Sequence, residues 1–297
     1  IDAAAIAEYL RKNNSQCRPL LYNSPDIERL KILSIIHSRI TEEHARYKNK
    51  LHFAVRQYFY IHDGLFTDFG CIVQLKMLIK YPTFYALKEA TDEELIDFLK
   101  TNKYRKPGYI NKVIEKINSY DQLISPEVEF SYALEVRMLC EILLTLKDNL
   151  KVIEDEMNVI LDNHYLGEIF RSLPGAGIVL ACKLLAVFGD NMDRFGNANQ
   201  AQCLFGTAPK NYQSGNYHKV TMRKACNKSA KAVLYSFAFS SMHFCQWARS
   251  YYYEQRDKGK TNSVAIRALS NKWVKVIFRI WKDNIFYQED KKIVSAA

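Results

Sequence analysis

One serine is distinguished by the residues around it. Ser214 precedes Gly215 in the stretch NYQSGNYHKVTMRKACNKSAK, residues 211–231. A serine hydroxyl among cations could attack a phosphate, because cations hold the charge that develops in phosphoryl transfer. Taken alone, the spacing favours an ordinary turn serine over a nucleophile.

The cations near Ser214 belong to a range without acidic residues. From Arg194 to Tyr253 there is no Asp or Glu, and the net charge of the 297-residue chain is +10. The range holds eight basic residues: Arg194, Lys210, Lys219, Arg223, Lys224, Lys228, Lys231 and Arg249. A solvated helix face normally mixes both signs, so this range predicts a nucleic-acid surface. The residues expected to contact phosphates, without reading sequence, are Lys210, Lys219, Arg223, Lys224, Lys228 and Lys231.

Composition argues against a zinc-binding protein and against a membrane protein. The seven cysteines form no CxxC pair and no histidine cluster has zinc spacing, so we predict no zinc site and a reducing cytosol. Cys140 and Cys182 lie in apolar helical stretches and are expected in the core. We predict no membrane partner, because no apolar run reaches 18 residues, and we find no signal peptide.

The elements that must position these residues are mainly helical. Ser24 as N-cap and Pro25 as first helical residue begin a helix of about 35 residues. Thr91 and Glu94 form a capping box in a small helical insertion, expected at about 75–120. After Ser214 we predict two long helices, broken at Gly259, with five residues of the second facing inward: Val264, Leu269, Trp273, Ile277 and Ile280.

A heptad pattern marks residues 134–161. Apolar residues alternate at spacings of four and three: Leu139, Leu143, Leu146, Leu150, Ile153, Met157 and Ile160. The pattern fits a helix packed on its own domain. It equally fits an antiparallel coiled coil, formed with the 26–60 helix or with another subunit. A helical hairpin carrying the small insertion would satisfy both interpretations.

Leu173 to Ala181 reads L-P-G-x-G-[IV]-x-x-A and leads into a helix, which resembles a helix-hairpin-helix element. In such a turn Gly175 and Gly177 would let a DNA phosphate approach backbone N–H groups. A turn with purely structural glycines is the alternative.

His218 and His243 fit packing or phosphate contacts better than general acids. Trp247 and Tyr251–Tyr253 fit packing better than base stacking.

Three blocks resemble one family in order and spacing: residues 173–215, residues 224–235 (KACNKSAKAVLY) and residues 252–278. They are similar to the C-terminal transposase domain of the IS110/IS1111 (IS116/IS110/IS902) family, including its Y-x-S-G element. IDAAAIAEYL at the N-terminus looks like the end of that family's K-T-D-x-x-D-A-x-x-[IL]-A element. RYKNKLHFAV resembles its following helix.

The resemblance implies a recombinase that inserts and excises a mobile element in the bacterial or archaeal cytoplasm, at the nucleoid. It implies a RuvC-like domain whose DEDD acids bind Mg²⁺, DNA as substrate and, in the IS110 branch, a structured bridge RNA. The active site would be composite, within a dimer or tetramer. By position Ser214 matches the nucleophile and Asp2 the last acid, a catalytic metal ligand. Asp2 also fits an acid that interacts with a helix dipole.

Four parts are expected: a remnant of the RuvC-like domain at 1–17, a helical coiled-coil region at 18–165, a transposase domain at 166–290 and a tail at 291–297. The other acids would precede Ile1, so we expect this chain alone to be inactive. Cys226 stands where the family usually has glycine, and we expect it in a standard backbone conformation. A non-catalytic nucleic-acid-binding module, truncated or domesticated, is the alternative function. A structural coiled-coil protein is a third.

Overall fold

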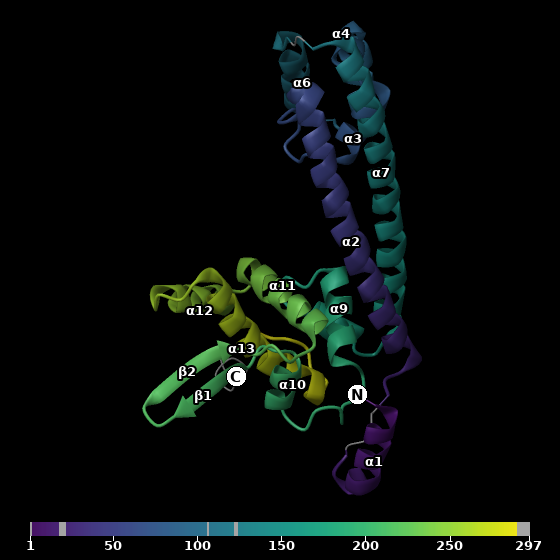
Figure 1. The fold of residues 1–297 in the computed structure, drawn as a ribbon. Helices are drawn as coiled ribbons and strands as arrows, with labels where there is room; N and C mark the ends of the chain where they lie inside the picture. The colour runs from purple at the N-terminus through teal and green to yellow at the C-terminus, as the bar shows by residue number, and fades with distance from the viewer. Residues whose placement is uncertain (1, 18–21, 106, 122–123, 290–297) are drawn as a thin grey trace. The chain divides into compact units, whose positions relative to one another are not determined.

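The computed structural model describes residues 2–17, 22–105, 107–121 and 124–289, so the predicted tail at 291–297 lies outside it. The described chain is mainly helical, which confirms the predicted fold class, and includes one two-stranded hairpin (Figure 1). It forms two compact units. The first comprises Ile1–Ser34 with Glu156–Ala297, and the second Ile35–Asp155. Helices α2 (Pro25–Tyr58) and α7 (Pro126–Asn163) contribute to both.

In the second unit α2 and α7 are antiparallel neighbours. The rings of Tyr58 and Tyr132 stack at 6.0 Å, and His37 Nε2 lies 3.1 Å from Glu154 Oε1. Between the two helices the chain forms five short ones: η2 (Tyr60–His62), α3 (Ile72–Lys80), α4 (Phe84–Glu89), α5 (Asp92–Thr101) and α6 (Pro107–Ser119). Their apolar residues share one core with the end of α2 and the start of α7. The small helices therefore pack together with α2 and α7 around a single core.

The helix starts follow the sequence signals. α2 begins at Pro25, and the N–H of Ile27 donates to Ser24 Oγ at 3.4 Å. Thr91 and Glu94 form the predicted capping box at α5, with each side chain accepting a backbone N–H. Both N-cap predictions are confirmed, because caps depend only on residues a few positions apart.

The heptad residues of α7 are buried at the two ends of the pattern. Leu139, Leu143, Met157 and Ile160 are at most 7% exposed. Leu146, Leu150 and Ile153 between them are half-buried. Leu139 and Leu143 pack in the core of the second unit. The ends of the pattern thus pack within the chain, while the coiled coil stays a prediction.

In the first unit α13 (Asn262–Asp283) is the central helix. It packs against α10 (Ala198–Leu204), α11 (Lys228–Phe244) and α12 (Gln246–Asp257). Leu269, Trp273, Ile277 and Ile280 are fully buried, as predicted. Val264 is 37% exposed, so its inward assignment is wrong; it lies in the first turn, where the helix has fewer neighbours.

Three helices, not two, follow the basic segment. α11 ends at Cys245, whose backbone is extended (φ −135°, ψ 121°), and α12 begins directly after it. The predicted break at Gly259 is confirmed, and its φ is +78°. Trp247 packs against Trp273 with ring centroids 4.6 Å apart and donates to Tyr287 Oη at 2.8 Å. Its role is packing, as favoured from the sequence.

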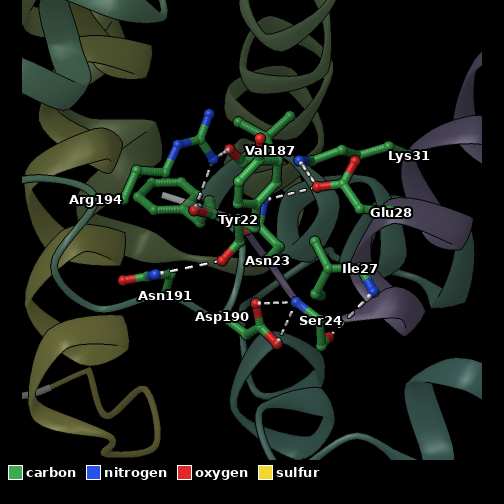
Figure 2. Close-up of polar contacts among 11 residues, drawn as sticks. Tyr22, Asn23, Ser24, Ile27, Glu28, Lys31, Val187, Asp190, Asn191 and Arg194 are labelled. Carbon is green, nitrogen blue, oxygen red and sulfur yellow. Dashed lines mark hydrogen bonds and ion pairs between the residues drawn. The ribbon is translucent and has the colours of Figure 1, made fainter. Parts of the chain in front are cut away.

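The start of α2 is fixed to the segment that follows α9 (Ile178–Phe188), as Figure 2 shows. The N–H of Ser24 donates to both carboxylate oxygens of Asp190, at 3.1 and 3.3 Å. Arg194 Nη1 donates to the carbonyls of Val187 and Phe188 at 2.7 and 2.9 Å. Arg194 therefore caps the end of α9 and is used within the fold.

Candidate nucleic-acid interface

Ser214 is the last residue of a β-strand. β1 (Pro209–Ser214) pairs antiparallel with β2 (Tyr217–Met222), and Ser214 lies opposite Tyr217. The two-residue turn between them is Gly215-Asn216, where Gly215 has φ +53°. A glycine with positive φ at the first turn position is typical of the type II′ hairpin. The sequence interpretation of Ser214 as a turn serine is thus close, but it missed both strands.

The strand register places Ser214 on a basic and aromatic face. Residues directly opposite in an antiparallel pair point to the same side, and alternate residues share that side. The pairs on this side, which we call the serine face, are Lys210 with Thr221, Tyr212 with Lys219, and Ser214 with Tyr217. The pairs Gln213 with His218 and Asn211 with Val220 lie on the opposite face. His218 is therefore on the wrong side of the hairpin to act on Ser214.

The serine face is exposed and cationic. The Lys210 ammonium lies 4.6 Å from the centroid of the Tyr212 ring. Hydrogen bonding to Lys210 lowers the pKa of the Tyr212 hydroxyl below its usual value. A hollow of about 620 Å³ is lined by residues of this face together with Arg223 and Lys224. Ser214 does not line it, although its register partner Tyr217 does.

The base of the hairpin is a close contact between Gly206 and Cys226. Gly206 has φ +70°, and a Cβ added there would overlap Cys226 Sγ and stand 2.7 Å from its Cβ. The N–H of Asn227 donates to the Leu204 carbonyl at 2.8 Å and closes the same junction. Cys226 has no positive φ, which confirms its expected standard backbone. A side chain at position 226 thus fits because position 206 has none.

Lys228 and Lys231 lie in the first turn of α11, which Asn227 caps. Lys231 Nζ lies 5.7 Å from the ring centroid of Tyr235. Arg267 of α13 interacts with the same tyrosine. Burial raises the pKa of the Tyr235 hydroxyl, and the charge and hydrogen bonding of Arg267 reduce that rise. Sequence analysis missed Arg267, because it follows the acid-free range and no pattern separates it from other cations of α13.

Two arginine nitrogens at this side of the first unit have unmet hydrogen-bonding capacity. Arg223 Nε and Arg267 Nε are both buried and have no hydrogen-bond partner among the described residues. Arg249, in contrast, is used within the fold: it donates to the carbonyls of Met242 and His243 at 2.8 and 3.1 Å. With Arg194 also inside, two of the eight cations of the acid-free range are structural.

The two glycines of the predicted helix-hairpin-helix differ. A Cβ at Gly175 would meet Phe244 Cδ2 at 2.8 Å, and Ser240 Oγ donates to the Gly175 carbonyl at 2.7 Å. Gly175 is thus needed for packing on α11. Gly177 precedes the first residue of α9 and has no atom within 4 Å of its Cβ position. Of the pair, Gly177 leaves room for a phosphate, and that role stays a prediction.

Asp2 is the N-cap of α1 (Ala3–Asn13) and accepts the N–H of Ala4 at 3.2 Å. No residue of α1 is buried. No cluster of three or more His, Cys, Asp or Glu side chains in the described part of the chain could hold a metal ion. The role of Asp2 as a metal ligand stays a prediction. None of the helices in the described ranges has the length and apolar character that crossing a membrane requires.

Comparison with known proteins identifies the segment that contains the hairpin. Residues 167–253 match the model of the transposase IS116/IS110/IS902 family, from α8 (Gly167–Arg171) into α12. This segment of the chain is therefore the part that is similar to transposases of the IS116/IS110/IS902 family. The matched segment includes Ser214, both strands, and all six cations predicted to contact phosphates.

Relatives extend the similarity over most of the chain. A 43.6 kDa protein of insertion element IS110 from Streptomyces coelicolor is 25% identical over 97% of this chain and 71% of its own length. A candidate transposase of the IS117 mini-circle from the same organism is 26% identical over 92% of this chain and 67% of its own length. A 42 kDa protein of IS900 from Mycobacterium paratuberculosis is 24% identical over 72% of this chain. The last alignment spans 53% of that relative.

Proposed function

We propose that this chain is part of a DNA transposase of an insertion element, in which the hydroxyl of Ser214 attacks a DNA phosphate. The observation that supports this most directly is the place of Ser214. It is exposed at the end of β1, on the face that also carries Lys210 and Lys219, inside the family-matched segment. A nucleophile for a polymer must be reachable, and the hairpin extends it from the helical body.

The proposed step is a transesterification. A bond forms between Ser214 Oγ and phosphorus while the bond from phosphorus to one deoxyribose oxygen breaks. The serine loses its proton and the released sugar hydroxyl gains one. The phosphodiester is conserved as a protein–DNA link, which the reverse attack by another sugar hydroxyl resolves. Strand exchange therefore needs no external energy source.

The cations of the serine face would hold the phosphate during this step. Lys219 and Lys210 lie on the same side of the hairpin as Ser214, and the exposed Lys224 lies just beyond β2. Positive charge stabilises the pentacoordinate transition state, and glycine in the turn keeps the approach to Ser214 open. Gly215 has no atom within 4 Å of its Cβ position, which fits this requirement.

Metal, guide and oligomer come from the family resemblance. Mg²⁺ held by DEDD acids would activate the hydroxyl, but we assign no step to it because the described residues offer Asp2 alone. No acidic residue lies within the range that surrounds Ser214, so carboxylates would have to come from another part of the protein or from a second copy. A composite site of this kind, and a structured RNA as guide, remain part of the proposal.

The test is a covalent adduct. The protein in its complete encoded form is incubated with a labelled target duplex, its RNA and Mg²⁺, then denatured and separated on a gel. We expect an adduct that Ser214→Ala abolishes and that Ser229→Ala, a control in the same acid-free range, leaves intact. Duplex binding without any adduct would instead support the non-catalytic binding module.

The role of the serine face can be tested by moving one charge across the hairpin. Lys219→Ala should weaken binding to unrelated duplexes alike and lower the salt slope by about 1. Adding Gln213→Lys restores the net charge on the opposite face. If the serine face binds DNA, the double variant stays weak. If the double variant regains wild-type affinity, net charge alone is responsible and the face assignment is wrong.

A further inference from the structure

A second basic and aromatic surface lies in the second unit, far in sequence from the hairpin. Between Asp97 and Asp121 the chain has six basic residues and one acidic residue, Glu115. Most acidic residues of the same small helices precede this stretch: residues 89–97 include five of them, counting Glu89 and Asp97. Residues 89–120 thus carry no net charge, but their acidic residues come first and their basic residues follow.

The structure collects part of this charge around two adjoining hollows. One, of about 480 Å³, is lined by Tyr104, Tyr109, Lys112 and Lys116, by the acidic Glu115, and by neighbouring residues of α6 and the segment after η2. The other, of about 370 Å³, shares both tyrosines and adds Lys103 and Arg105. Lys103, Arg105 and Lys112 are exposed and form no ion pair with any described residue. We call these joined hollows the tip groove.

Two tyrosines form the wall that the hollows share. The rings of Tyr104 and Tyr109 meet edge to face at 6.4 Å, and Tyr104 meets Phe66 in the same way at 5.5 Å. Tyr109 is 49% exposed, and Lys112 Nζ lies 6.0 Å from its ring centroid. The inner tyrosine thus anchors the outer one, whose ring borders the cations.

Lys103 has a backbone conformation that glycine normally takes. Its φ is +65°, directly after the C-terminus of α5. The N–H of Tyr104 donates to the Leu99 carbonyl at 2.9 Å and the N–H of Lys103 to the Lys100 carbonyl at 3.1 Å. These two bonds define a Schellman motif, in which glycine is strongly favoured at the position of Lys103. A strained lysine at the edge of a groove indicates that its charge has a use.

We propose that the tip groove binds single-stranded nucleic acid. Lys103, Arg105 and Lys112 would contact successive phosphates, and the ring of Tyr109 would stack on a base. Cations that follow a backbone, interleaved with exposed rings, are the combination that binds single strands without sequence preference. A duplex keeps its bases stacked and offers none to Tyr109, so a single strand is the better ligand. The site is separate from the serine face and does not depend on Ser214 chemistry.

The conformation of Lys103 gives a sharp test, because binding and folding should move in opposite directions. Lys103→Gly removes the charge and relieves the backbone strain. We expect the melting temperature to stay equal or rise, while affinity for a labelled 12-nucleotide poly(U) RNA falls at least threefold. Lys112→Ala should give a similar loss. Lys76→Ala, an exposed lysine of α3 outside the groove, is the charge-matched control and should bind as wild type.

Three ligand arms identify what is bound. Poly(U) RNA and poly(dT) DNA of equal length decide between the two kinds of strand, and a 12-base-pair duplex should bind the groove more weakly than either. A polyglutamate competitor tests for a site that takes any acidic polymer. Equal loss in Lys76→Ala, wild-type binding by Lys103→Gly, or displacement of RNA by polyglutamate at equal charge would each overturn the proposal.

Photocrosslinking separates this site from the serine face in the same molecule. A 5-iodouridine strand should crosslink to the tryptic peptide of residues 106–112, which contains Tyr109, and Tyr109→Ala should remove that crosslink. The variants Lys219→Ala and Ser214→Ala should not reduce it. Crosslinks confined to the hairpin peptide would contradict a tip groove, while leaving the proposed function untouched.

Discussion

The contact between Gly206 and Cys226 gives the most specific prediction about how the hairpin is held. Gly206→Ala introduces two unfavourable terms. The residue keeps φ +70°, a left-handed conformation that costs an L-residue about 1–2 kcal/mol. Its new methyl would overlap Cys226 Sγ, and forcing a group into a packed site costs about 1–3 kcal/mol. We expect a total destabilisation of about 2–5 kcal/mol.

The two terms can be separated with a matched control. Gly259 has a similar φ of +78° and no atom within 4 Å of its Cβ position, so Gly259→Ala reports the strain alone. The steric term should be removed by Cys226→Gly, which deletes both overlapping atoms. In the double variant Gly206→Ala with Cys226→Gly, we therefore expect recovery of about 1–3 kcal/mol.

Urea unfolding followed by tryptophan fluorescence measures these changes, since Trp273 and Trp281 are fully buried in the same unit. The midpoints should shift at unchanged slope. Equal destabilisation by Gly206→Ala and Gly259→Ala would refute the contact. Absence of recovery in the double variant would show that Cys226 is not the obstacle.

Three further predictions concern stability. Burial lowers the pKa of His62 to about 3. Below about pH 6.5 the unfolded chain therefore binds a proton at this histidine that the folded chain does not bind. The free energy of unfolding should fall by about 2 kcal/mol between pH 6.5 and pH 5 as a result. His62→Leu should flatten that slope in urea unfolding, and an unchanged slope would argue against a neutral buried histidine. Burial would raise the pKa of Asp190, but hydrogen bonds from Ser24, from the Asp190 backbone and from His164 together lower it. The contribution of Asp190 to stability is therefore present above its unfolded pKa and is lost as the pH falls through the lowered folded pKa. Asp190→Asn should therefore destabilise at pH 7 and lose less on acidification than wild type, as acid unfolding would report. Thr91→Ala removes the α5 cap and should lower the free energy of local opening at the start of α5 by about 1 kcal/mol, which speeds hydrogen exchange of the first-turn amides. An unchanged exchange rate would show that the cap does not stabilise this helix.

The elements that could be predicted from the sequence carry local signals. Ser24 with Pro25, and Thr91 with Glu94, mark helix starts within three or four residues. The hairpin gave no such signal, because strands exposed on both faces lack the alternation of apolar residues that identifies a half-buried strand. Gly215 indicates a turn, but the flanking residues do not distinguish a hairpin turn from a loop.

The residues of the candidate site also divide into those with a local sequence signal and those whose position depends on the folded structure. The six cations predicted to contact phosphates could be found because they follow one another along an acid-free range; four are exposed, and Arg223 and Lys231 are half-buried. That Arg194 points inward depends on the carbonyls of Val187 and Phe188, which only the folded end of α9 presents to it. Arg267 reaches Tyr235 from another helix. The break at Cys245 has neither glycine nor proline, so no sequence rule placed it.

The central claim is that Ser214 becomes linked to DNA. The most direct measurement is mass spectrometry of the denatured protein–DNA adduct after nuclease and trypsin digestion. Trypsin cleaves after Lys210 and Lys219, so Ser214 lies in the peptide Asn211–Lys219 with no other serine or threonine. The proposal predicts a nucleotide on this peptide, at Ser214. A nucleotide on Tyr212 or Tyr217, or on a peptide outside this range, would contradict it.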